Sequence, residues 1–154
     1  PIFREQKYGK IIAISSVAAV APIPFQGFYS ASKSAIMLLM QSLSMEMKPY
    51  NVHCTCVLPG DVKTDFTASR KYTEASKLPG SAYTDAMHAA VQTMEKDEQN
   101  GMKPLVIAKA IHKVLKKKNP GHVVVPHITY KLLYLLIKLV PTRLKIWVIS
   151  KLYS

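Results

Sequence analysis

The chain is poor in the features that identify several common classes of protein. Its 154 residues include only 9 acidic residues, 6 glycines and 2 cysteines. No glycine-rich turn of the kind that cradles nucleotide phosphates occurs in it. No apolar run reaches the uncharged length that a membrane-spanning helix needs. Neither a complete nucleotide-binding turn nor a transmembrane helix is therefore predicted within these residues.

The two cysteines, Cys54 and Cys56, lie two positions apart in an apolar run. On a strand they would face the same side, where a disulfide across so short a span would strain the backbone. They are not flanked by further Cys or His residues at the spacing of metal ligands. We expect reduced thiols in the core and no metal site, and we assign no role to the five histidines.

The composition is strongly basic, with 21 Lys and Arg residues and a formal net charge of +12. Such a charge attracts phosphates, anionic lipid or nucleic acid. The lysine-rich segments 103–118 and 131–151 lack the interleaved aromatic and glycine pattern of an RNA-binding sheet. We therefore expect no nucleic-acid partner.

The hydrophobic pattern predicts an α/β domain. Short, near-continuous apolar runs are typical of buried parallel strands, and apolar residues at helical spacing indicate helices between them. The expected strands cover 10–15, 52–58 and 122–125, and the expected helices cover 29–47, 84–98 and 104–118. Segment 67–81 is expected to be a loop or short helical pieces. This alternation is typical of a parallel sheet with right-handed crossovers.

The last segment, 128–154, differs from the rest because it is strongly apolar and also basic. Its charged residues are Lys131, Lys138, Arg143, Lys145 and Lys151, and its interfacial aromatics are Tyr130, Tyr134, Trp147 and Tyr153. This pattern favours a pair of amphipathic helices lying in the surface of an anionic membrane. The alternative is that these helices cover a substrate cleft or form a dimer surface.

Three short motifs stand where the expected strands end. Tyr29 and Lys33 are one helical turn apart, just after a strand that ends in Ser15 and Ser16, and segment 59–64 follows the next strand. Ligand sites in open α/β sheets lie at such strand ends. A phenol, an ammonium and a hydroxyl brought together there could protonate a carbonyl oxygen while hydride arrives from a cofactor. The motifs therefore indicate a ketone/alcohol redox site.

The motifs GKIIAISS (9–16), YSASKSA (29–35) and PGDVKT (59–64) together resemble the C-terminal half of a classical short-chain dehydrogenase/reductase, over residues 8 to about 125. The resemblance implies half of a Rossmann-like, doubly wound parallel sheet. We therefore predict a partial catalytic domain over 1–127 and, from the apolar and basic pattern described above, an amphipathic helical segment over 128–154.

By this resemblance, Ser16 orients the substrate carbonyl and Tyr29 is the general acid or base. Lys33 holds the ribose of the cofactor and favours the ionised form of the phenol. Pro59, Gly60, Val62 and Thr64 would contact the nicotinamide end. The family spacing selects Ser16 over Ser15, because neighbouring strand residues face opposite ways. An alternative for Thr64 is that it caps a helix beginning near Asp65.

The family's glycine-rich turn, the residue that chooses NAD or NADP, and its catalytic asparagine would lie upstream of Pro1. The sequence is therefore expected to be a fragment that is inactive alone. We predict an NAD(P)-dependent oxidoreductase, with NADP favoured over NAD, that interconverts a ketone and a secondary alcohol.

Phe25, Phe28, Phe66 and Tyr72, near the expected cleft, favour an apolar substrate such as a lipid, steroid or retinoid. We expect the longer protein to be a cytoplasmic homo-oligomer, peripheral on a membrane. The alternative is a noncatalytic module that keeps the fold and serves for membrane attachment or dimerisation.

Overall fold

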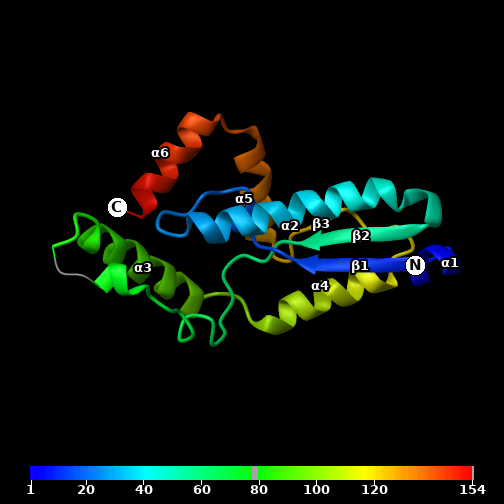
Figure 1. Cartoon of the computed structure of the whole chain (residues 1–154), viewed down its shortest axis with the longest axis horizontal. Coiled ribbons are helices and arrows are strands. Elements are labelled where there is room, and N and C mark those ends of the chain that lie inside the picture. The colour runs from blue at the N-terminus through cyan, green and yellow to red at the C-terminus, as the bar shows by residue number, and fades with distance from the viewer. Residues whose placement is uncertain (78–79, 154) are drawn as a thin grey trace.

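The computed structural model describes residues 1–77 and 80–153 and shows a parallel sheet with helices around it (Figure 1). Its strands are β1 (Gly9–Ile14), β2 (Val52–Val57) and β3 (Val123–Val124), in the order β1-β2-β3. The β1–β2 register runs from Gly9 opposite Val52 to Ile14 opposite Val57. Because the strands are parallel, their carboxyl ends meet at one edge of the sheet.

The helices are α1 (Ile2–Gln6), α2 (Gly27–Glu46), α3 (Thr84–Gln99), α4 (Pro104–Lys116), α5 (Ile128–Leu139) and α6 (Thr142–Leu152). Every strand and long helix expected from the pattern is present, within a few residues of its expected bounds. Three short elements were not expected: α1 and the 3-10 turns Val17–Ala19 and Lys48–Tyr50. The 3-10 turn Glu74–Lys77 lies in segment 67–81, where a loop or short helical pieces were expected and of which residues 78 and 79 are outside the described part. Ser154, the last residue of the expected C-terminal segment, is also outside it.

The core lies around the central strand β2, which has a neighbouring strand on each side. Cys54, Cys56 and Val57 on this strand are at most 2% exposed, and both cysteines are free thiols. Met37 and Met40 of α2 pack into the same cluster. Figure 1 shows α2 and α4 on opposite sides of β1 and β2. Coverage of both faces agrees with the burial along β2, where Cys54 and Cys56 on one face and Thr55 and Val57 on the other are all buried.

Helices α5 and α6 form the arm at the top of Figure 1. Tyr134 of α5 is buried in the core cluster, and Lys145 of α6 donates a hydrogen bond to the Val20 carbonyl at 3.4 Å. The arm is therefore packed on the domain, and its division from residues 1–127 remains a prediction. Within the described residues, no helix combines the length and apolarity that crossing a bilayer requires.

Candidate active site

The ends of β1 and β2 are joined by backbone hydrogen bonds that continue the strand register. The Ser15 amide donates to the Val57 carbonyl at 2.8 Å, and the Val17 amide donates to the Pro59 carbonyl at 2.9 Å. A cleft of about 520 Å³ opens at this edge of the sheet. It is lined by every catalytic or cofactor-contacting residue that the sequence predicted: Ser16, Tyr29, Lys33, Pro59, Gly60, Val62 and Thr64. Of the four aromatic residues expected near the cleft, Phe66 lines it, whereas Phe25, Phe28 and Tyr72 do not.

Tyr29 and Lys33 lie in the first two turns of α2, where a spacing of four residues places them on the same side of the helix. The Lys33 ammonium is 5.6 Å from the centroid of the Tyr29 ring and 3.5 Å from the Ile14 carbonyl oxygen. The strand end therefore holds the cation beside the phenol.

Ser15 and Ser16 have different environments. The Ser15 hydroxyl is 4% exposed and donates to the Lys33 carbonyl at 2.7 Å, so it fixes the strand end to α2. Ser16 is half-buried, and its hydroxyl oxygen accepts from the Ala18 amide at 3.1 Å, which caps the 3-10 turn. Its hydroxyl hydrogen can still donate to a ligand. Both serines line the cleft, and the choice of Ser16 over Ser15 stays a prediction.

Cys56, on β2, forms a hydrogen bond with Ser15 and is close enough to Lys33 for the positive charge to act on its thiol. Burial raises the pKa of the Cys56 thiol, and the hydrogen bond with Ser15 and the positive charge of Lys33 oppose this only in part. A thiol that stays protonated is a poor nucleophile and a poor metal ligand. Among the described residues, no group of three or more His, Cys, Asp or Glu side chains could hold a metal ion.

Segment 59–64, called here the cofactor loop after the role that the sequence predicts for it, is braced on its backbone by the connection between α3 and α4. The Met102 amide donates to the Asp61 carbonyl at 2.9 Å, and the Lys63 amide donates to the Met102 carbonyl at 3.0 Å. The Thr64 hydroxyl accepts from the Phe66 amide at 3.2 Å. The residues after Thr64 form turns instead of the helix that was considered near Asp65, so this hydroxyl caps a turn.

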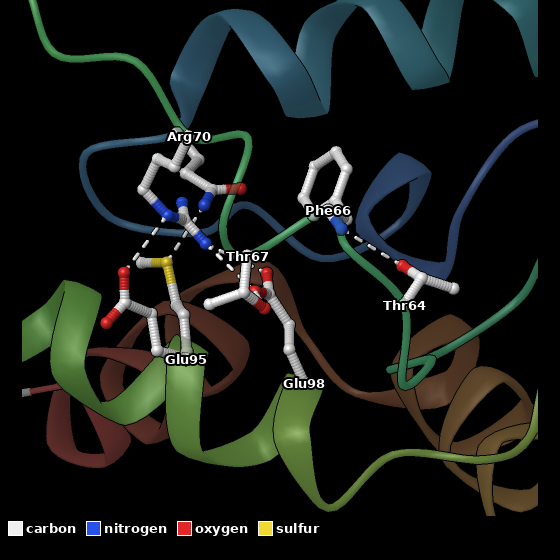
Figure 2. A network of polar contacts seen from close by, with 8 residues as sticks. Thr64, Phe66, Thr67, Arg70, Glu95 and Glu98 are labelled. Atoms are coloured by element: carbon white, nitrogen blue, oxygen red, sulfur yellow. Dashed lines mark hydrogen bonds and ion pairs between the residues drawn. The ribbon is translucent and has the colours of Figure 1, made fainter.

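A polar network, shown in Figure 2, ties the segment after the cofactor loop to α3. Arg70 contacts Glu98 at 2.9 Å and Glu95 at 3.6 Å, and the Thr67 hydroxyl donates to Glu98 at 2.6 Å. The Arg70 and Glu98 side chains are 14% and 12% exposed, so solvent screens this pair less than a surface pair. The network holds one wall of the cleft, and no sequence spacing pointed to it.

A second contact that the sequence did not predict joins the cofactor loop to the C-terminal arm. The Tyr130 hydroxyl, on α5, donates to a carboxylate oxygen of Asp61 at 2.6 Å. Burial raises the pKa of Asp61, and the hydrogen bond from Tyr130 opposes this only in part. Burial and the hydrogen bond to Asp61 raise the pKa of Tyr130 to about 12. Tyr130 is therefore a neutral donor at physiological pH.

Most of the remaining cleft wall is apolar. It is formed by Ile23, Phe66, Met94, Ile107, Ala108 and Ile111. Tyr153, just after α6, also lines the cleft, and burial raises the pKa of its phenol. The Phe66 ring lies 6.2 Å from the Tyr29 ring, centroid to centroid. The arrangement places the Tyr29 phenol and the Lys33 ammonium beside a largely apolar cavity that is open to a ligand.

Sequence comparison supports what the geometry suggests. Residues 1–75 match the model of the short chain dehydrogenase family. The chain is 39% identical over 120 residues to the 3-ketodihydrosphingosine reductase of Bacteroides thetaiotaomicron, a match that covers 78% of this chain and 44% of that protein. It is 43% identical over 67 residues to the 11-beta-hydroxysteroid dehydrogenase-like 3 of Arabidopsis thaliana, covering 44% of this chain and 21% of that protein.

Solved structures share the fold. A short-chain dehydrogenase from Streptomyces avermitilis superposes with a TM-score of 0.73 at 21% identity, covering 90% of this chain and 49% of that one. One from Burkholderia phymatum in complex with NAD gives 0.67 at 21% identity, covering 86% and 48%. One from Burkholderia cenocepacia in complex with NADP gives 0.63 at 17% identity, covering 90% and 47%.

The chain thus spans less than half the length of the curated relatives that it matches. The three motifs, the parallel sheet with helices and the relatives all agree on one assignment. The chain is part of a Rossmann-like α/β oxidoreductase fold and belongs to the short-chain dehydrogenase/reductase family.

Proposed function

We propose that this chain is the catalytic half of an NAD(P)-dependent oxidoreductase that interconverts a ketone and a secondary alcohol. The observation that carries the proposal is the convergence of Ser16, Tyr29 and Lys33 with the cofactor loop on one cleft. Tyr29 and Pro59, the first residue of the loop, are 30 positions apart in sequence. A noncatalytic scaffold would have no chemical need for this trio in one cavity.

The donors in the cleft fit the nicotinamide-ribose end of a dinucleotide, because an ammonium, a phenol and a serine hydroxyl can all bond oxygen atoms. When bound, the dinucleotide would supply or accept the hydride. Tyr29 would give its proton to the carbonyl oxygen in reduction and remove it from the alcohol in oxidation. Ser16 would hold that oxygen by donating a hydrogen bond. Lys33 would bind the ribose and stabilise the phenolate form of Tyr29.

The proposed cofactor is NAD or NADP, with NADP favoured. Structural neighbours include complexes with each of them. No glycine-rich phosphate cradle occurs in these 154 residues, and the pyrophosphate of a dinucleotide is normally held by such a turn at a helix N-terminus. We therefore propose that a longer protein supplies that half and that the isolated chain is inactive.

We expect the isolated chain to bind NADPH or NADH no more tightly than about millimolar, because only the nicotinamide and ribose ends have partners. Isothermal titration calorimetry would measure the affinity. The control is the longer protein that includes the upstream half, for which micromolar binding is expected. Micromolar binding by the isolated 154 residues would contradict the proposed location of the cofactor.

The proposed substrate is a small apolar ketone or alcohol with lipid, steroid or retinoid character. The apolar wall of the cleft supports this, as do the names of the two relatives, one a reductase of a ketodihydrosphingosine and one similar to a hydroxysteroid dehydrogenase. Apolar side chains recognise a substrate through the area that it buries against them.

The function can be tested with a series of ketones of increasing alkyl length, assayed with NADPH and NADH in the longer protein. If the apolar wall binds the chain of the substrate, kcat/KM should rise roughly fourfold per buried methylene until the cleft is filled. Hydroxylated ketones of equal length are the control. Equal activity on apolar and hydroxylated ketones would exclude an apolar substrate, and no oxidation or reduction of any ketone or alcohol pair would exclude the reaction.

A second candidate is a noncatalytic, membrane-peripheral or dimerising module, and the exposed apolar surface of the C-terminal arm favours it. Leu132, Leu136, Leu139 and Trp147 are each more than half exposed. We propose that the arm attaches a cytoplasmic, homo-oligomeric enzyme to an anionic membrane. This proposal is compatible with catalysis, because the arm's exposed leucines and the cleft residues are different side chains.

A further inference from the structure

Gly60, in the cofactor loop, lies against the aromatic ring of Tyr130. A Cβ atom placed on Gly60 would overlap three carbons of that ring. The backbone of Gly60 is not in the left-handed region that favours glycine, whereas that of Gly80 is. An L side chain is therefore compatible with the conformation of Gly60, and it is the Tyr130 ring that leaves no room for one.

Tyr130 contacts the next residue of the loop as well. Its hydroxyl donates to the Asp61 carboxylate at 2.6 Å, while its ring covers Gly60. The His127 ring lies 6.2 Å from the Tyr130 ring, centroid to centroid, in an edge-on arrangement. A single side chain of α5 thus fixes both the face of Gly60 and the side chain of Asp61.

We propose that Tyr130 is a positioning residue for the cofactor loop, so that the C-terminal arm helps to hold the nicotinamide end of the dinucleotide in place. This inference rests on the proposed function of that loop. Tyr130 acts through Gly60 and Asp61, and it is not among the residues that line the cleft. It also explains the glycine, which the sequence motif had assigned to cofactor contact alone.

The other braces of the loop act on different atoms. Val17 and Met102 bond the backbone at Pro59, Asp61 and Lys63. Gly101 packs against the Asp61 carbonyl. Tyr130 supplies the hydrogen bond to the Asp61 side chain. Loss of the Tyr130 hydroxyl should therefore loosen the loop without unfolding the strand ends.

The test uses the longer protein with Tyr130→Phe, which keeps the ring and removes only the hydroxyl. Loss of one hydrogen bond to a buried carboxylate should raise KM for the dinucleotide roughly tenfold, while kcat changes less than about threefold. Hydrogen exchange at the amides of 60–63 should quicken about tenfold, with exchange in β1 unchanged. Unchanged exchange at 60–63 would overturn the proposal, and this readout stays informative even if no dinucleotide-dependent activity is found.

A double-mutant cycle tests the role of the glycine. Gly60→Ala alone should weaken dinucleotide binding strongly, because the new methyl group displaces the Tyr130 ring. In a Tyr130→Ala background, the same change should have little further effect, because the ring is gone. If Gly60→Ala weakens binding equally in both backgrounds, the glycine serves the cofactor directly and the packing argument is wrong. Thermal unfolding of all four proteins would verify that each is folded.

Discussion

Replacing Tyr29 with phenylalanine in the longer protein is expected to lower turnover by a factor of about 10² to 10⁴, which is the range for loss of a general acid or base. The change removes one hydroxyl and nothing else. Because that hydroxyl would act only while the proton moves, kcat should fall far more than substrate affinity changes. Steady-state kinetics in both reaction directions would measure the loss.

The fold should tolerate this change. Tyr29 is half-buried near the start of α2, and the phenylalanine ring can keep the contact with Phe66 at 6.2 Å. The matched control is Tyr83→Phe, because Tyr83 is 71% exposed and does not line the cleft. The control should be fully active. If the Tyr29→Phe protein retains more than about a tenth of the activity, Tyr29 cannot be the acid or base.

The fold was predictable because several independent local signals agree. The β-branched run before Ser15 and the apolar run before Pro59 indicated buried parallel strands, and both strands were found. Proline and glycine residues then marked where the elements end. The candidate site was predictable for a related reason: in a parallel sheet, residues at the ends of neighbouring strands must converge.

The remaining contacts were not predictable, because they join residues far apart in sequence with no periodic relation. Arg70 meets Glu98 across 28 positions, and Tyr130 meets Asp61 across 69. Nothing in the pattern distinguishes these charged and phenolic residues from solvated ones. The short turn Val17–Ala19 was also not predicted; the Ser16 hydroxyl, which accepts from the Ala18 amide, stabilises it.

The C-terminal arm retains a large exposed apolar surface even though it packs on the domain. Only Tyr134 of this arm is buried, whereas Leu139 is 82% exposed and Leu152 is 64% exposed. Basic side chains Lys131, Lys138 and Arg143 are exposed on the same two helices. Apolar insertion and attraction to anionic headgroups would act together on such a surface.

Lys and Arg near a charged leaflet contribute about 1 kcal/mol each at moderate salt, so several together matter but can be screened. We therefore expect the longer protein to sediment with vesicles that contain anionic lipid, to bind neutral vesicles weakly, and to be released at high salt. Cutting the chain after Pro126 should abolish binding. That deletion also removes Tyr134 from the core, so its effect alone cannot separate lost anchoring from lost folding.

Point substitutions in the arm make the separation. Leu136→Glu and Leu139→Glu replace exposed side chains and leave Tyr134 in place, so they should keep the fold yet weaken vesicle partitioning by more than about tenfold each. Leu105→Glu is the matched control, because Leu105 is 59% exposed but lies on α4, outside the arm. Its binding should equal that of the unchanged protein.

If all of these proteins stay in solution with every vesicle composition, and the arm substitutions instead convert a dimer into a monomer, the arm is a protein interface and the membrane proposal is wrong. Release only by detergent, with no effect of salt, would mean that insertion is deeper than an interfacial helix allows.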